Sequence, residues 1–375
     1  MRLASVFAAI IGLVLIGALV GYFGVEAVTR SLIAVGWIGF AVICLIHLAL
    51  IAAMGIAWGV LLPGASLWVA IWGRLVRDSG SEVLPLSQVG GYVLGARAVT
   101  FVGVRGTSAT ASTIVDVTLE LFAQLVYTTL ALSWLLYLRP DAPIATPVAI
   151  GLIVAALLAA AFVGVQRRGL AVFDRLARAL GRGWADNTAA GAAALHRALA
   201  DIYKRPVGIW VSFILHLACW IASTFEAWLA LRFAGAPLDF ATVLVIESLL
   251  YAARSVAFAV PNAVGVQEGT YILLGASFGL TPEMALALSL LKRARDVTIG
   301  LPALAAWQLL ESGRLWRRIA AFARSAHFEN ETPVKMTGVS APPAGCDDRA
   351  MRIDGGHNDA TRSCTNPVKV AIYIR

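Results

Sequence analysis

Residues 289–310 read SLLKRARDVTIGLPALAAWQLL, an apolar stretch that carries charged side chains near its middle. Lys292, Arg293, Arg295 and Asp296 lie within five consecutive positions, and apolar residues flank them on both sides. A charge at the centre of a bilayer costs roughly 3 kcal/mol or more. The stretch therefore predicts a membrane helix whose charged face points into the protein and away from lipid.

The composition of the whole chain agrees with a membrane protein. Of 375 residues, 59% are hydrophobic and 14% are charged, whereas soluble domains carry about 25% charged residues. The net charge of +8 does not indicate nucleic-acid binding, because lysine and arginine lie in loops and in the tail between apolar runs, as the positive-inside rule produces. We therefore predict an all-α, polytopic integral membrane protein.

The apolar runs predict the spans. A crossing helix needs about 20 apolar residues, and the candidates are 3–24, 32–62, 107–138, 147–165, 207–231, 239–258 and 283–310. The first run is longer than the apolar core of a signal peptide, so we interpret it as a first span. Residues 66–78, SLWVAIWGRLVRD, are interpreted as a short interfacial helix because two tryptophans one turn apart are followed by two arginines.

Two stretches, 84–104 and 260–280, do not resemble simple spans. Each begins close to a proline and contains several glycines in apolar company. Non-helical backbone at membrane depth is tolerated only where protein buries it or where it lines a cavity. We interpret both as re-entrant or broken-helix hairpins, and surface loops are the alternative. The residues that mark them are Pro85, Gly90, Gly91, Arg97, Pro261, Asn262 and Gly265.

A weak internal repeat relates the two hairpins. When the chain is shifted by 176 residues, Pro85 aligns with Pro261, Gly103 with Gly279, and Glu120 with Asp296. Each copy then consists of a hairpin followed by a helix with ionisable side chains. Paired repeats with broken helices that meet near the midplane are common in transporters.

The charge of the loops predicts the orientation. Residues 166–206 hold eight lysines and arginines against three aspartates, so this loop is expected in the cytoplasm, and the N-terminus with it. Seven crossings would place the basic C-terminal segment on the opposite side, so we expect one hairpin, or part of 32–78, to add a crossing, which gives about eight and a cytoplasmic C-terminus. Residues 1–311 are expected to form the membrane domain. Residues 312–375 are expected to form a cytoplasmic, largely disordered tail.

The ionisable side chains inside the apolar runs are the candidate functional residues. Asp116 and Glu120 lie four residues apart on one helical face, and so do Lys292 and Asp296. We expect carboxylates to neutralise the cations along a hydrated substrate path, although ion pairs that only hold helices together are the alternative. The predicted path comprises Asp116, Glu120, Glu247, Arg254, Glu268, Lys292, Arg293, Arg295 and Asp296.

Other candidates carry less weight. His47 and His216 are expected to be hydrogen-bonded core residues, and Glu226 is expected near the membrane interface. The four cysteines show neither CxxC nor cysteine/histidine metal spacing. Phosphate-loop, zinc-protease and nucleophile-elbow motifs do not occur. We therefore predict no catalytic residue, no metal and no cofactor.

Three stretches, GGYVLGARAV, ASTIVDVTLE and LKRARDVTIGLPAL, resemble a known family. They are similar to the flippase-like membrane domains related to lysylphosphatidylglycerol synthases, and most similar to the hopanoid-biosynthesis-associated branch. The resemblance covers residues 1–311. It departs at Asn262 and Ala263, where the family tends to have two glycines. The aminoacyl-transferase domain of the synthases is not part of the resemblance, so lysine transfer is not expected.

The resemblance implies a function in lipid handling. It implies a flippase-like transporter in the bacterial inner membrane that moves a hopanoid or phospholipid between leaflets, with lipid-biosynthesis proteins as possible partners. The alternative is a membrane-embedded lipid-modifying enzyme, or a scaffold for one, in which Asp116 and Glu120 would act as acid and base.

Overall fold

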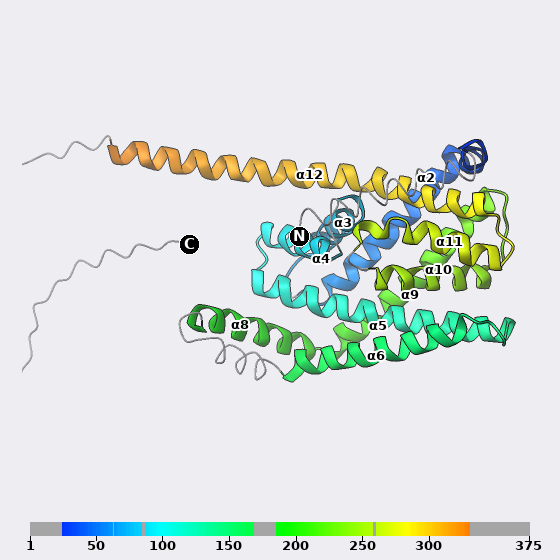
Figure 1. Ribbon diagram of the computed structural model, residues 1–375. Helices are drawn as coiled ribbons and strands as arrows, with labels where there is room; N and C mark the ends of the chain where they lie inside the picture. The colour runs from blue at the N-terminus through cyan, green and yellow to red at the C-terminus, as the bar shows by residue number, and fades with distance from the viewer. Residues whose placement is uncertain (1–24, 63, 85–87, 169–184, 258–259, 331–375) are drawn as a thin grey trace, which may run out of the picture. The chain divides into compact units, whose positions relative to one another are not determined.

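The computed structural model describes residues 25–62, 64–84, 88–168, 185–257 and 260–330, and these residues form helices without strands (Figure 1). Packing separates two units, Met1–Ile319 and Ala320–Arg375, and every contact described below lies within the first. The elements are α2 (Val25–Gly59), α3 (Leu67–Val83), α4 (Gln88–Phe101), α5 (Gly106–Leu138), α6 (Ala145–Arg168), α8 (Ala185–Tyr203), α9 (Pro206–Phe233), α10 (Phe240–Val256), η1 (Pro261–Ala263), α11 (Val266–Ser277) and α12 (Pro282–Asn330).

Four helices in the described part of the chain are long and apolar enough to cross a membrane. They are Ile33–Gly59, Gly106–Leu138, Ala145–Arg167 and Pro206–Phe233, which confirms four of the predicted spans. Large apolar side chains are exposed along them, as at Leu157 (66%) in α6, so these faces suit lipid. The chain is an integral membrane protein.

The remaining predicted spans differ in outcome. Residues 3–24, the C-terminal tail from 331 and Pro85 lie outside the described residues. Residues 239–258 form α10, which has only 17 residues, and residues 283–310 form part of α12, where charged side chains interrupt the apolar run. The total number of crossings stays a prediction.

Helices α5 and α9 run in the same direction. Asp116 bonds to His216, and farther along both helices Tyr127 bonds to Thr224. The residue numbers of the bonded pairs therefore increase in the same direction along both helices. The chain must therefore return through α6 before α9 begins. Helix α8, which precedes α9, packs on the first half of α5, since Leu199 lies in one apolar cluster with Ala111 and Val115.

The internal repeat predicted from the sequence matches the element order. A 17-residue helix, a short helix and a long helix follow each other as α3–α4–α5 and again as α10–α11–α12. Gly103 and Gly279 both adopt positive φ, 104° and 80°, at the turn before the long helix. Glycine adopts this conformation without steric cost, so both copies turn in the same way.

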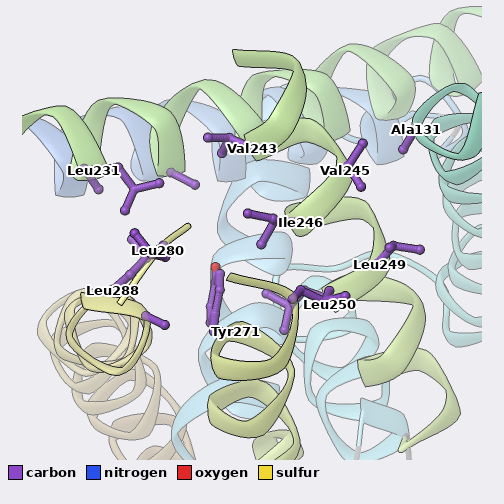
Figure 2. Close-up of a cluster of buried hydrophobic side chains, with 14 of the residues drawn as sticks. Ala131, Leu231, Val243, Val245, Ile246, Leu249, Leu250, Tyr271, Leu280 and Leu288 are labelled. Atoms are coloured by element: carbon purple, nitrogen blue, oxygen red, sulfur yellow. The ribbon is translucent and has the colours of Figure 1, made fainter. Parts of the chain in front are cut away.

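An apolar cluster holds the second copy against α5 and α9 (Figure 2). It draws side chains from α9, α10, α11 and α12, including Leu231, Ile246 and Leu288. Tyr271 belongs to this cluster, is fully buried and bonds through its hydroxyl to Glu247. Apolar packing thus fixes one edge of a buried polar network.

Left-handed backbone marks the break between α10 and α11. Asn262, Ala263 and Gly265 have φ values of 50°, 44° and 83°, and the Gly265 N–H donates to Glu268 Oε2 at 2.7 Å. An alanine in this region is strained by roughly 1–2 kcal/mol. In this strained turn, the side-chain amide of Asn262 donates to the backbone carbonyl oxygen of Glu82 at 2.5 Å. This hydrogen bond links the second copy to α3.

Replacing Ala263 by glycine should relieve this strain. Part of the gain is offset because glycine is more flexible in the unfolded chain, so we expect a stabilisation of up to about 1 kcal/mol. Ala276→Gly, in the exposed face of α11, should instead cost about 1 kcal/mol. Thermal unfolding in detergent micelles compares the two variants. If both are destabilised equally, the turn at Ala263 is not strained.

Candidate functional site

Two arginines of α3 are buried against two carboxylates of α5. Arg77 donates to Asp116 Oδ2 at 2.6 Å and to Glu120 Oε2 at 2.5 Å. Arg74 donates to Glu120 at 2.8 and 3.1 Å and to Asp78 at 2.7 Å. The arginines are only 4% and 2% exposed. Our interpretation of these arginines as part of an interfacial surface helix was therefore wrong.

The cations next to Asp116 and Glu120 also differ from those we expected. We expected the cations of residues 292–295 to neutralise them, but α3 supplies both partners. The remaining Asp116 oxygen contacts His216 Nε2 at 2.9 Å. His216 is thus a buried, hydrogen-bonded core residue, as we expected, and its partner is an ionisable group.

Lys292 and Glu247 form a second buried pair, between α12 and α10. The Lys292 ammonium donates to Glu247 Oε2 at 2.5 Å and to the Tyr271 hydroxyl at 2.8 Å. Tyr271 in turn donates to Glu247. The structure brings these two predicted residues together, and a tyrosine from α11 completes the bonding of both.

Arg293 bonds to Glu268, so α12 is also tied to α11. The distance from Arg293 Nε to Glu268 Oε1 is 2.6 Å. Ser289 donates to the same carboxylate at 2.9 Å, and Gln267 donates to Ser289 at 2.9 Å. Glu268 therefore serves both as the cap of α11 and as the counter-ion of Arg293.

Arg295 and Asp296 connect α12 to α9 and α2. Arg295 donates to Glu226 and to Asp296 at 2.7 Å. His47 of α2 contacts Glu226 Oε2 at 3.0 Å. Glu226 is 1% exposed, so our expectation of an interfacial carboxylate was wrong, and its two partners explain how the protein accommodates its charge.

Arg254 of α10 reaches across to α3. It donates to both oxygens of Glu82, at 2.7 and 2.8 Å, and to Gln267 at 3.0 Å. Asn262, one of the predicted hairpin residues, bonds to the Glu82 backbone. This link joins the two copies of the repeat. Sequence patterns did not indicate Glu82, because it lies at the end of a mixed polar segment.

Arg97 lies apart from these groups. Its side chain is 62% exposed and pairs with Glu311 of α12. The glycines of the first hairpin have a packing role, because an added Cβ at Gly91 would lie 2.6 Å from the Arg77 carbonyl oxygen. Gly90 is half-buried, and Pro261 opens the short helix η1.

A cavity of about 350 Å³ opens among these networks. Its wall combines cationic, anionic and aromatic side chains from both copies of the repeat and from α2 and α9. The ionisable and aromatic lining residues are His47, Arg74, Arg77, Asp78, Glu82, Tyr92, Glu120, Trp220, Tyr251, Arg254, Arg295 and Asp296. Asp116, Glu247, Glu268, Lys292 and Arg293 lie behind this wall, in the ion pairs given above. Some of the predicted path residues thus line the cavity, and the others form ion pairs behind its wall.

Charge in the cavity wall is nearly balanced. Four arginines and four carboxylates line it, together with His47. Aromatic rings cover two of the cations, since Arg77 lies 4.4 Å from the ring centre of Tyr92 and Arg254 lies 6.0 Å from that of Tyr251. Such a wall can hold charges of both signs. Among the described residues, no group of three His, Cys, Asp or Glu side chains is placed to hold a metal ion.

The long apolar helices and this buried charged cavity define a polytopic helical membrane protein with an internal polar site. The family model for the lysylphosphatidylglycerol synthase TM region matches residues 6–303. The chain therefore belongs to that family, and the match includes the charged segment of α12. No match is found among curated proteins or among solved structures.

Proposed function

We propose that this protein transports a polar-headed membrane lipid between leaflets, with the headgroup in the cavity and the apolar part in lipid. Family membership relates the chain to lipid synthesis or flipping. The observation that carries the proposal is the cavity of about 350 Å³ with charged walls, enclosed by helices with lipid-exposed apolar faces. A headgroup needs such polar surroundings to cross an apolar layer.

Arg77 is the group best placed to receive a headgroup. Its Nε has no hydrogen-bond partner among the described residues although the side chain is buried. The nearest carboxylate oxygen in an ion pair with it, Asp78 Oδ1, is 4.0 Å away. A buried donor without a partner costs roughly 1–3 kcal/mol. A phosphate or hydroxyl oxygen of a lipid headgroup would remove this cost once the Arg77 side chain turned its Nε toward the cavity that it lines.

The resemblance to the hopanoid-associated branch suggests a hopanoid as the cargo, and a phospholipid is the alternative. It also suggests the bacterial inner membrane, with lipid-biosynthesis proteins as partners. The charge of the loops predicts that the N-terminus and residues 166–206 lie in the cytoplasm. These assignments belong to the proposal, and so does the interpretation of the stretches around α4 and α11 as re-entrant hairpins.

A lipid-modifying enzyme is the competing function. It would need Asp116 or Glu120 as a free acid or base. Each carboxylate is instead engaged by charged hydrogen-bond donors, Asp116 by Arg77 and Glu120 by both arginines of α3. Carboxylates held in this way are poor proton carriers, which favours transport.

The test uses the pair Glu82–Arg254, which lines the cavity but is partly exposed, at 22% and 13% of the side chains. The double variant Glu82→Gln/Arg254→Gln removes both charges together, so neither remains unpaired. We expect purified protein in vesicles to move NBD-labelled phosphatidylethanolamine between leaflets, measured by dithionite quenching. The double variant should slow this movement at least about tenfold, which corresponds to the loss of one charged contact of 1.4 kcal/mol or more.

The matched control is Asp201→Asn/Lys204→Gln, a neutralised pair on the exposed surface, which should move the probe at the wild-type rate. An unchanged rate in the cavity variant would contradict the proposal. Lipid analysis of a deletion strain separates the two functions, because a lipid in the wrong leaflet supports transport whereas loss of one lipid species supports the enzyme.

A further inference from the structure

Two polar atoms on one face of α9 lack hydrogen-bond partners among the described residues. They are Ser212 Oγ and His216 Nδ1, and both side chains are 0% exposed. Residues four apart on a helix lie on the same face, with Cβ atoms about 5–6 Å apart. More than nine in ten buried polar groups are bonded to protein or water. Two adjacent exceptions therefore indicate a ligand that bonds to both.

A second hydroxyl, that of Ser112, lies at the same level on α5. Ser112 precedes Asp116 by four residues, as Ser212 precedes His216, and the two helices run in the same direction with Asp116 bonded to His216. Ser112 donates to the Ala109 carbonyl oxygen and accepts from Trp58, both at 3.1 Å. Its oxygen can accept one more bond. A buried water needs two to four polar partners, and these three side chains can supply them.

We propose that Asp116, His216 and Ser212 form a proton-binding site behind the wall of the cavity, where Asp116 bonds to the lining residue Arg77. The Asp116 carboxylate only accepts, so His216 Nε2 carries the hydrogen of their bond and Nδ1 holds the lone pair. A hydronium ion from solvent gives its proton to this lone pair and becomes water. The ring becomes an imidazolium whose new N–H points to the water and hydroxyl of Ser212, while Nε2–H stays on Asp116. Histidine is the side chain suited to this change near neutral pH.

Charged groups close to His216 would respond to a positive charge on its ring. From α3, Arg74 and Arg77 face it through Asp116, and from α5 Glu120 lies one turn beyond. Ionisable groups of the other helices packed on α9 have different partners. His47 of α2 bonds to Glu226, Glu247 and Arg254 of α10 bond to Lys292 and Glu82, and Asp201 of α8 bonds to Lys204.

Protonation acts on the cavity through Asp116. This carboxylate divides its two oxygens between His216 and Arg77. An imidazolium draws it more strongly than a neutral ring does, so the hold on Arg77 weakens and the guanidinium becomes available to an anionic headgroup. Proton binding would thus favour headgroup binding, a link that depends on the proposed function, whereas the proton site itself does not.

Nitrogen-15 NMR of histidine-labelled protein in micelles tests the site, with His216→Gln to assign the ring signals. His216 should be the Nε2–H tautomer at pH 8 and should gain a proton at Nδ1 as the pH falls to about 5. Ser212→Ala should shift the Nδ1 signal, since it removes one bonding partner of the water. The hydroxyl bonds to no described residue, so this variant should fold.

Glu226→Gln is the control, because it alters the other histidine–carboxylate pair. It should change the His47 signals and leave those of His216 in place. The proposal is overturned if His216 remains neutral down to pH 5, or if Ser212→Ala leaves its Nδ1 signal unchanged. If His216 gains a proton but wild-type protein moves no NBD-labelled lipid, the proposed function fails and the proton site stands.

Discussion

Asp116→Asn should destabilise the folded protein by on the order of 3 kcal/mol. Asp116 is fully buried and bonds to Arg77 and His216, so the change leaves two arginines of α3 with too little negative charge around them. Removing one member of a buried ion pair typically costs 3–5 kcal/mol, and pairs in membranes often show less. Membrane abundance and thermal unfolding in micelles measure the loss.

A second substitution identifies the partner. Asp116→Asn/Arg77→Gln should recover much of the stability, because the excess positive charge is gone. Asp116→Asn/Lys292→Gln should recover none, because Lys292 bonds to Glu247 and its removal leaves another charge unpaired. Transport should stay low in both double variants, since Arg77 lines the cavity. Rescue by Lys292→Gln and not by Arg77→Gln would contradict the pairing described above.

The sequence predicted where charge would be buried better than how the charges would pair. Helical periodicity placed Lys292, Arg295 and Asp296 on one inward face, and they are 5%, 5% and 9% exposed. Lipid excludes charge from its side of the helix, so a single helix suffices for that inference. Pairing depends on which helices are neighbours, and periodicity carries no information about neighbours.

Arg74 and Arg77 show this limit most clearly. A short helix with tryptophans followed by arginines has the composition of an interfacial helix, and its burial follows only from the packing of α4 and α5 around it. The repeat was the one long-range signal available. It correctly aligned the elements of the two copies, but it aligned Asp116 with Lys292, residues of opposite charge, so it could not identify their partners.

The glycines of α4 also indicate a structural feature, although it differs from the one we predicted. We interpreted Gly90 and Gly91 as marks of a re-entrant or broken-helix hairpin, and they lie in α4, a helix from Gln88 to Phe101. Gly91 and Gly95 face α3, where an added Cβ would lie 2.6 Å from the Arg77 carbonyl oxygen and 2.7 Å from the Arg77 Cβ, respectively. Their function in the fold is close approach of the backbones, and this contact positions the arginine that lines the cavity.

Gly91→Ala should therefore destabilise the protein by about 1–3 kcal/mol, the usual cost of overpacking, and should reduce lipid movement as well. The new Cβ would lie 1.8 Å from Ser81 Oγ and 2.6 Å from the Arg77 carbonyl oxygen. The serine can rotate away, whereas the carbonyl belongs to the helix backbone. Helix α4 must then move away from α3 next to Arg77, the arginine that lines the cavity.

Two further variants separate this clash from the general effect of alanine in a helix. Gly164→Ala in α6 meets no atom within 4 Å and should stabilise the protein by up to about 1 kcal/mol through helix propensity. Gly91→Ala/Ser81→Ala removes the serine contact but leaves the carbonyl contact, so it should recover only part of the loss. Thermal unfolding and the NBD-lipid assay report both effects. Wild-type behaviour of Gly91→Ala in both measurements would mean that the α3–α4 contact does not position Arg77.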